Sequence, residues 1–463
     1  MTVAPPAKPI APRPVLEIAV GPEIPALGPA AEKKSSLGIR IDLGTRFKPI
    51  AREYDADLKI NEDVTGKSRC AGEVDDFKNY FLNRFDILRK ILKSSRREMS
   101  DAVSIARAKR STGEVKVIGM VQTLNNTKNG HRIILLEDEE DSINLMINAS
   151  NQDLLKLKVI TDEVIGITGK INQKHDMIYL DEIYWPEIPM AHQSNSAQLP
   201  LSAAFISDIH LGSKTFLKKS WDRFLQWLSG KTGTKRENDI VSSIKYLVIA
   251  GDNVDGIGIY PGQYKDLDIT DIYEQYESLA FEMERIPDYI NVIMMPGNHD
   301  AVRPNEPQPA MHQELCEKFT RPITFTGNPC NMSLSGVDVL AYHGRSLDDF
   351  VTKFDNVTYE TPLEAMKEML NRRHMLPIYG EKTPIAPEPY DYMVIRKVPD
   401  IFVTGHVHSY GAKLYRGVIC LNSSCWQSQT SYQKLMNFVP QPAKVPIVNL
   451  QTKVMSVMDF LAS

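Results

Sequence analysis

The chain is poor in cysteine, and no two of its cysteines stand in a CxxC arrangement. It has five cysteines among 463 residues, an odd number, so we expect neither a disulfide framework nor a zinc site built on cysteine. No stretch approaches the ~20 apolar residues that cross a bilayer. The N-terminus also lacks the basic and then apolar order of a secretory signal. The sequence therefore predicts a protein of the cytoplasm that has no membrane partner.

An excess of positive charge is also lacking, because 58 Asp and Glu residues outnumber 54 Lys and Arg residues and give a formal net charge of −4. This balance argues against a broadly cationic surface for nucleic acid. Affinity for nucleic acid would have to come from local patches, bound metal or a partner chain.

The length is too great for one ordinary core, so two or three domains are expected. The first 38 residues are rich in proline and alanine and follow no period, which is typical of a flexible tail. The predicted organisation, in chain order, is a disordered tail (1–38), an N-terminal extension (39–110), a β-barrel domain (111–185), a linker (186–199) and a layered α/β domain (200–463).

The N-terminal extension is predicted to contain an amphipathic helix over residues 73–93. Its apolar residues recur at intervals of three and four and share one helix face; they are Phe77, Phe81, Phe85, Leu88 and Leu92. The chain turns basic near the end of this helix, at Arg89, Lys90, Lys93, Arg96, Arg97, Arg107, Lys109 and Arg110. These residues indicate either a surface that faces phosphates or an ordinary solvated face, and the sequence favours neither.

Five short candidate strands follow the extension. They cover residues 115–121, 131–136, 142–147, 163–171 and 177–183, with a short helix at 152–157. A helix between the third and fourth of five strands is the order of an OB-fold barrel, a frequent module for binding single strands. Outward aromatic residues for stacking on bases are not evident. We therefore expect an OB-fold that serves as a structural platform more than as a DNA-binding surface.

The last domain repeats one design at five places, where a short apolar run is followed by residue types that bind metals. The runs cover residues 203–207, 246–250, 291–295, 337–342 and 401–404. The residues that follow them are Asp208 and His210, Asp252 and Asp255, Asn298 and His299, His343, and His406 and His408. Strand ends in an α/β sheet meet at one edge, so these side chains are predicted to converge. Glycines directly before Asp252, Asn298 and His406 permit tight turns there.

This ordered set of residue types indicates a pair of metal ions. Aspartate supplies charge, histidine supplies neutral nitrogen, and a bridging carboxylate can hold two metals about 3.5–4 Å apart. Mixed nitrogen and oxygen ligands suit manganese, iron or zinc better than calcium. One histidine at a strand end is usually structural, but five of the ten histidines in the chain fall inside this set. We therefore expect two divalent ions, and the sequence does not separate the three metals.

The ordered motifs resemble those of the calcineurin-like metallophosphoesterases, whose fold places helices outside two packed sheets in four layers (α-β-β-α). The resemblance implies a first metal on Asp208, His210, Asp252 and His408, and a second on Asp252, Asn298, His343 and His406. It implies that His299 binds no metal but contacts the scissile phosphate and protonates or stabilises the departing oxygen. Asp255 stands at the spacing of the carboxylate that orients this histidine in the family.

One position departs from the phosphoprotein phosphatases of this superfamily. Those enzymes carry an arginine directly after the second aspartate, where this chain has Gly256. The departure argues against a protein phosphatase and leaves phosphate binding to other groups. Arg303 and Arg345 are the candidates for substrate binding, and an ordinary surface role is equally well supported for each.

A closer resemblance covers most of the chain and is strongest over residues 251–263, 342–349 and 422–427. These segments are similar to the small subunits of archaeal family-D DNA polymerases. The resemblance implies a proofreading 3′→5′ exonuclease that acts on single-stranded or mismatched DNA ends and releases nucleoside 5′-monophosphates. It also implies a large polymerising subunit as partner, a place at the nucleoid, and manganese as the metal that best supports activity. All eight positions expected for the metals and the acid are filled, so we expect an active enzyme.

Two other functions are considered beside this one. A separate phosphomonoesterase or protein phosphatase would need no large partner, and Gly256 argues against it. A protein that only assembles the polymerase would have no nuclease activity, and the complete set of ligand positions argues against it. The segment 426–448, with Phe438, Val439 and Val445, is a candidate contact with the large subunit, although an ordinary final strand and loop is slightly favoured.

Overall fold

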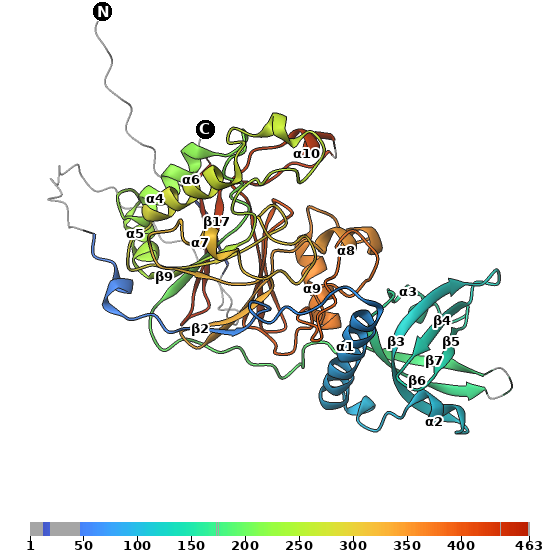
Figure 1. The fold of residues 1–463 in the computed structure, drawn as a ribbon. Helices are drawn as coiled ribbons and strands as arrows, with labels where there is room; N and C mark the ends of the chain where they lie inside the picture. The colour runs from blue at the N-terminus through green and yellow to red at the C-terminus, as the bar shows by residue number, and fades with distance from the viewer. Residues whose placement is uncertain (1–12, 19–46, 173, 175, 436, 462–463) are drawn as a thin grey trace, which may run out of the picture.

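The computed structural model describes residues 13–18, 47–172, 174, 176–435 and 437–461. It is a mixed α/β structure with two large sheets and a separate closed barrel (Figure 1). The sheets and their helices form the larger part, and the barrel lies to one side of it next to helix α1 (Val74–Ser95). Within the described residues, no helix combines the length and the apolar character that a membrane crossing needs.

The larger part contains a seven-stranded and a six-stranded sheet. In spatial order the first consists of β1 (Arg13–Ile18), β18 (Met455–Asp459), β17 (Lys444–Asn449), β8 (Ser202–Ile206), β9 (Ile244–Ala250), β10 (Asn291–Met295) and β11 (Ile323–Phe325). The second consists of β15 (Tyr410–Tyr415), β16 (Val418–Ser423), β14 (Ile401–Thr404), β13 (Val337–Ala341), β12 (Cys330–Leu334) and β2 (Leu58–Glu62). The strands that precede the candidate ligands lie in the parallel regions of the two sheets.

The two sheets pack against each other and carry helices on their outer faces. Phe205 and Val248 of the first sheet share one core with Val339 and Val403 of the second. The alternate side chains point outward, because successive residues of a strand face opposite sides. The outer helices are α4 (Lys218–Leu228), α5 (Lys235–Ser242), α6 (Ile272–Glu284) and α7 (Gln313–Cys316) on the first sheet, and α8 (Leu347–Lys353) and α9 (Pro362–Arg372) on the second. Burial on both faces explains why the central strands are continuous apolar runs.

The barrel is closed and contains all five strands that the sequence predicts, with the short helix between the third and the fourth. In chain order its elements are β3 (Glu114–Asn126), β4 (Arg132–Glu137), β5 (Ser142–Ile147), α3 (Gln152–Lys156), β6 (Val164–Asn172) and β7 (Met177–Tyr184). The remaining short helices are α2 (Ile105–Lys109), α10 (Ser431–Leu435), η1 (Ile50–Glu53), η2 (Arg97–Met99) and η3 (Gln263–Asp266). The barrel has its own core, which includes Val117, Ile134 and Ile167.

The stretch predicted as a tail is described only in part. Its residues 13–18 form strand β1, which pairs with β18 at the edge of the seven-stranded sheet. The other residues of 1–38 lie outside the described part of the chain, so the prediction of a disordered tail stays a prediction there.

Helix α1 connects the barrel with the larger part of the molecule. It begins with a capping box formed by Glu73 and Asp76, which satisfies backbone N–H groups that have no partner inside the helix. The predicted apolar face packs inward at Phe85 and Leu88, in one core that contains residues of the barrel and Val394 of the larger part. The periodicity therefore predicted both the helix and its buried side.

A buried ion pair reinforces this connection. The Nε of Arg84 in α1 donates to Oδ2 of Asp391 at 2.9 Å, and neither side chain is exposed. The Nε2 of His374 donates to the same oxygen at 2.8 Å, while its Nδ1 accepts the backbone N–H of Leu376 at 3.0 Å. His374 must be neutral to make both bonds. Burial and the nearby Arg84 accordingly lower its pKa to about 4.

The low pKa of His374 predicts a loss of stability in mild acid. Its ordinary pKa is about 6.5, so the unfolded chain binds a proton between that pH and pH 4 that the folded chain does not bind. Stability from this group is therefore complete above about pH 6.5 and falls as the pH is lowered. Between pH 7 and pH 5 we expect the unfolding free energy of the parent protein to fall by about 2 kcal/mol more than that of His374→Gln. Equal pH dependence in denaturant titrations of the two proteins would contradict this assignment.

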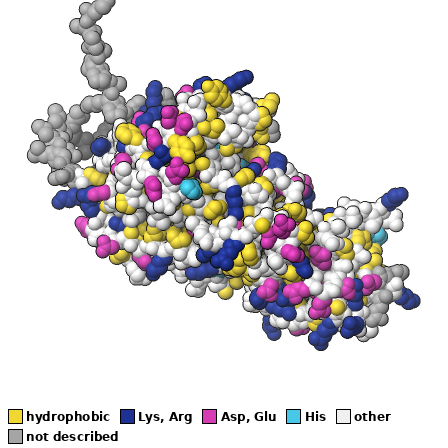
Figure 2. All heavy atoms as spheres, in the orientation of Figure 1, with side chains coloured by type: hydrophobic (Ala, Val, Ile, Leu, Met, Phe, Trp, Pro, Cys, Tyr) yellow, Lys and Arg dark blue, Asp and Glu magenta, His cyan; other side chains and the backbone are white. Residues whose placement is uncertain are grey.

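Two of the basic residues in and after the first helix are paired with acidic side chains. Arg89 forms ion pairs with Asp86 and Glu139, and Lys109 pairs with Asp141 and Asp176. Acidic and basic side chains are interspersed around the barrel and α1 (Figure 2). Of the two interpretations that the sequence left open, this part of the structure favours the ordinary solvated surface.

Candidate metal centre

The carboxyl ends of five central strands bring the predicted ligands together. The strands are β8, β9 and β10 of one sheet and β13 and β14 of the other, and the residues that follow them are Asp208 and His210, Asp252, Asn298, His343, and His406 and His408. Two sheets that pack face to face can direct side chains from separate parts of the chain into one volume. The convergence predicted from the strand ends is therefore present.

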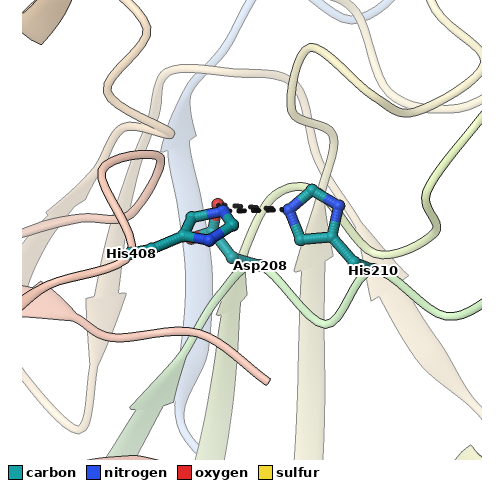
Figure 3. A group of neighbouring side chains, drawn as sticks. All are labelled: Asp208, His210 and His408. Carbon is teal, nitrogen blue, oxygen red and sulfur yellow. Dashed lines mark hydrogen bonds and ion pairs between the residues drawn. The ribbon is translucent and has the colours of Figure 1, made fainter. Parts of the chain in front are cut away.

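The first group of donor atoms consists of Asp208, His210 and His408, whose ligand atoms lie within 4.8 Å of one another (Figure 3). The Nε2 atoms of the two histidines are 3.1 Å apart. The Nε2 of His408 is 3.4 Å from Oδ1 of Asp208. The Nδ1 of His210 faces Oδ1 of Asp255 at 3.0 Å, so that carboxylate fixes the proton on Nδ1 and leaves the Nε2 lone pair for a cation.

A second group consists of Asp252, His343 and His406, whose ligand atoms also lie within 4.8 Å of one another. The Nε2 of His343 is 3.3 Å from Oδ2 of Asp252 and 3.1 Å from Oδ1 of Asn298. Its Nδ1 lies 2.9 Å from the carbonyl oxygen of Ala250, so Nδ1 carries a proton and Nε2 is the nitrogen that could bind a cation in place of a proton. The Oδ2 of Asp252 is also 3.8 Å from Nε2 of His210, which places this carboxylate between the two groups.

The backbone at these positions is in a conformation that L-residues rarely adopt. Five predicted ligands have positive φ, at 51° for Asp208, 50° for His210, 50° for Asp252, 68° for His406 and 52° for His408. Each such residue costs on the order of 1–3 kcal/mol, and such residues cluster at functional sites. The surrounding strands hold the side chains against this cost, as a preorganised binding site requires.

The glycines beside the ligands make room for them. A Cβ on Gly251 would meet Nδ1 of His343 at 2.5 Å, and a Cβ on Gly297 would collide with Oδ1 of Asp252. A Cβ on Gly405 would lie 2.5 Å from Oδ2 of Asp208. Gly251 also has a φ of +90°, as expected for a tight turn. At Gly297 and Gly405 glycine is required because neighbouring atoms leave no room for a side chain. The sequence had predicted a tight turn as the reason for glycine at these two positions.

The electrostatics of the cluster suit cations. Burial alone would lower the pKa of His343, but the carboxylates of Asp252 and Asp208 raise it to about 10. Burial alone would raise the pKa of Asp252, but His343 and His299 lower it well below its usual range. The carboxylates thus favour positive charge between them. Together with the converging histidine nitrogens, which bind a metal in place of a proton, this donor set fits two divalent ions.

His299 lies at the rim of the cluster, and one of its ring nitrogens lies within 4.8 Å of ligand atoms of His210 and Asp252. Its backbone N–H donates to Oδ1 of Asp252 at 2.8 Å, and its ring is 4.6 Å from the ring of His210. Its Nδ1 lies 2.7 Å from the backbone carbonyl oxygen of Asp255. A carbonyl only accepts, so Nδ1 carries a proton and Nε2 is the ring nitrogen left to face the site.

The expected role of the Asp255 carboxylate in orienting His299 is not what the structure shows. The carbonyl of Asp255 makes that contact, and its carboxylate instead contacts His210 and the amides of Gln263 and Gln427. The Asp255 carboxylate is buried, and its two oxygens face His210, Gln263 and Gln427. Asp255 therefore orients a candidate metal ligand with its side chain and His299 with its backbone.

The two arginines expected to bind substrate are committed elsewhere. Arg303 donates to the buried carboxylate of Glu388 at 2.8 Å and to the carbonyl of Pro307. Arg345 donates to the carbonyl of Pro304 at 2.7 Å. Neither is among the described residues that line the cavity over the ligand groups. The ordinary structural role is the better account of both.

Several residues of this cavity were not identified from sequence. They are Tyr260, Asp348, Tyr359, Val407, Gln427, Thr430, Tyr432, Gln433 and Phe438. Asp348 stands 3.6 Å from Nε2 of His406, and Gln433 stands 2.9 Å from Nδ1 of His408. Tyr260, Asp348 and Gln427 lie inside the segments that carry the family resemblance, which was a usable signal. The other aromatic residues lie in loops and a short helix, where no periodicity marks them.

The segment 426–448, which the sequence offered as a contact with the large subunit, contains both buried and exposed apolar residues. Phe438 lines this cavity and Val445 is buried in β17, whereas Val439 is 67% exposed. The ordinary strand that the sequence slightly favoured is therefore present in its second half.

Comparisons with known proteins place the chain in a family. The family model for the DNA polymerase alpha/epsilon B-subunit matches residues 203–413. A DNA polymerase II small subunit from Archaeoglobus fulgidus is 43% identical over 390 residues, which cover 84% of this chain and 78% of the relative. The protein of the same name from Methanocaldococcus jannaschii is 41% identical over 417 residues, or 89% of this chain and 70% of the relative. The one from Methanothermobacter thermautotrophicus is 41% identical over 415 residues, or 89% and 84%.

Proposed function

Because the chain belongs to the family of archaeal DNA polymerase II small subunits, we propose that it is also the proofreading 3′→5′ exonuclease of such a polymerase. In this proposal the two sheets and their helices are a calcineurin-like four-layer phosphoesterase, the barrel is an OB-fold, and a large polymerising subunit is the partner. One observation carries the proposal: two groups of nitrogen and carboxylate donors, all buried except the half-buried His406, meet at one carboxylate, Asp252.

The residues divide the chemistry between binding and proton transfer. Asp208, His210, Asp252 and His408 would hold one cation, and Asp252, Asn298, His343 and His406 a second. Two bound cations, for which manganese is favoured over iron and zinc, would supply hydroxide near neutral pH and offset phosphate charge. His299, with a proton on each ring nitrogen, would present Nε2–H to the departing 3′ oxygen and donate that proton to it, leaving the neutral ring with its proton on Nδ1. The product would be a nucleoside 5′-monophosphate.

Proofreading needs no recognition of a particular base in this scheme. A mismatched terminus separates from its partner strand more readily than a paired one, so mismatched ends reach the site more often. The ends of single-stranded DNA are substrates for the same reason.

The structure gives a reason to disfavour a protein phosphatase. Gly256 has a φ of +73°, and a Cβ at this position would collide with the backbone carbonyl oxygen of His299. The arginine that phosphoprotein phosphatases carry here could not be accommodated unless the His299 backbone moved. A phosphodiesterase that binds its substrate through other groups is therefore favoured.

The proposal is tested by digestion of a primer with a mismatched 3′ end. The purified chain, with and without its large subunit, is incubated with 5′-labelled primer and manganese, and released nucleotides are identified by mass spectrometry. We expect stepwise shortening and nucleoside 5′-monophosphates, complete loss with a chelator, and restoration by added manganese. Shortening that continues in chelator, or none under any of these conditions, would refute the proposal.

A further inference from the structure

The cavity over the ligand groups has a wall that the proposed hydrolysis does not use. The cavity has a volume of about 240 Å³. His210, Asp252, His299, His406 and His408 supply its polar wall. A second set of lining residues is aromatic and comes from separate segments: Tyr359 lies between α8 and α9, and Tyr432 and Phe438 lie in and after α10.

The aromatic wall neighbours the candidate ligands at two places. Gln433, next to Tyr432 in α10, places its amide 2.9 Å from Nδ1 of His408. Burial raises the pKa of the Tyr359 hydroxyl, and Tyr359 lies close enough to Asp348 for this carboxylate to raise that pKa further. Asp348 in turn stands 3.6 Å from Nε2 of His406. Two segments of the aromatic wall thus lie against the candidate ligands His408 and His406.

The three rings line the same cavity, and two of them pack edge to face. Phe438 is only 8% exposed, and its ring lies 6.1 Å from that of Tyr359 at an angle of 63°. Tyr432 is 64% exposed, so its ring is available to an incoming ligand. Helix α10 lies well away from the barrel (Figure 1), so the barrel does not cover this wall.

A nucleobase is the chemical group that matches this wall beside a phosphate-binding centre. Every base has a π-face, and stacking on aromatic side chains is tolerant of sequence. The cavity is smaller than most ligand sites, which measure about 300–1,000 Å³, so it suits one base and not a base pair. If the phosphate of a nucleotide lies at the polar wall, the base of the same nucleotide lies close to the aromatic wall.

We propose that Tyr359, Tyr432 and Phe438 hold the unpaired terminal base of a DNA 3′ end by stacking, while its phosphate lies at the ligand groups. This inference rests on the proposed exonuclease function and adds to it a means of selecting frayed ends. A paired terminal base must leave its partner before it can enter the cavity, so the site favours termini that are already unpaired.

The test compares two single-stranded DNA substrates, one with a normal 3′-terminal nucleotide and one whose terminal sugar lacks its base. The two-subunit protein is assayed with manganese, and kcat/KM is measured for each end. We expect the parent to prefer the base-bearing end about tenfold, equivalent to about 1.4 kcal/mol. In Tyr432→Ala and in Phe438→Leu the preference should fall to threefold or less, mainly through a higher KM for the base-bearing end.

Two controls separate stacking from a general effect on the fold. Tyr432→Phe retains the ring and should retain the preference. Leu435→Ala changes another residue of α10 that is 83% exposed and does not line the cavity, and it should also retain the preference. Two metal ions per chain in each variant would show that the centre is intact.

Each outcome decides between the proposals. Equal hydrolysis of both ends by the parent, or an unchanged preference in Tyr432→Ala and Phe438→Leu, would refute base stacking and leave the exonuclease function standing. Failure of the parent to release nucleotides from either end would refute both.

Discussion

Asp252→Ala is expected to lose both metal binding and exonuclease activity. The carboxylate is almost fully buried and lies between the two groups of donors, 3.3 Å from Nε2 of His343 and 3.8 Å from Nε2 of His210. It is the only residue that the proposed scheme assigns to both cations. Removing it takes a negative charge from each site. Because bound metal contributes several kcal/mol to catalysis, we expect the rate to fall at least on the order of 10³-fold.

The measurement is metal content by elemental mass spectrometry together with nucleotide release. The parent protein should retain two ions per chain after gel filtration in manganese, and Asp252→Ala fewer than one. Asp268→Ala, which removes an exposed aspartate outside the cavity, should match the parent in both measurements. An Asp252→Ala protein that keeps two ions and full activity would show that the shared carboxylate has no such role.

His299→Gln is expected to lose activity while keeping its metal. The side chain of His299 is not among the assigned ligands, and the backbone N–H that donates to Asp252 remains in the variant. Loss of a general acid typically costs about 10²–10⁴-fold in rate. We therefore expect kcat to fall by about that factor, with two ions per chain still bound. His312→Gln, a change at an exposed histidine outside the cavity, serves as the matched control.

A substrate with a better leaving group tests whether His299 acts as an acid. The p-nitrophenyl ester of thymidine 5′-monophosphate releases a phenolate that needs no proton. His299→Gln should therefore be impaired much less on this ester than on DNA, by about tenfold or less. Equal losses on the two substrates would mean that His299 does not donate the proton, even if it contributes in another way.

The sequence predicted the structure best where the residues of one short segment determine it. Strands buried on both faces are continuous apolar runs, and a metal-binding residue directly after each run must lie at the sheet edge. The convergence of Asp208, Asp252 and His343 could therefore be predicted from the sequence alone. The same holds for helix α1, whose period of three and four residues is a property of one segment.

The partners of side chains in loops could not be predicted in this way. The Asp255 carboxylate turns to His210 because two glutamines and the His210 ring happen to surround it in the folded chain. Arg303 is occupied by Glu388, a residue 85 positions away. Tyr432 and Phe438 line the cavity because helix α10 and the residues after it pack beside the cavity. Such contacts depend on tertiary packing, for which spacing in the sequence gives no rule.

The metal pair itself is the claim on which the proposed chemistry depends, and anomalous diffraction tests it directly. Crystals of the protein grown with manganese would be measured on both sides of the manganese absorption edge. Two peaks are expected, one among Asp208, His210 and His408 and one among Asn298, His343 and His406, with Asp252 between them. Maps without a peak in either group, at saturating manganese, would contradict the account.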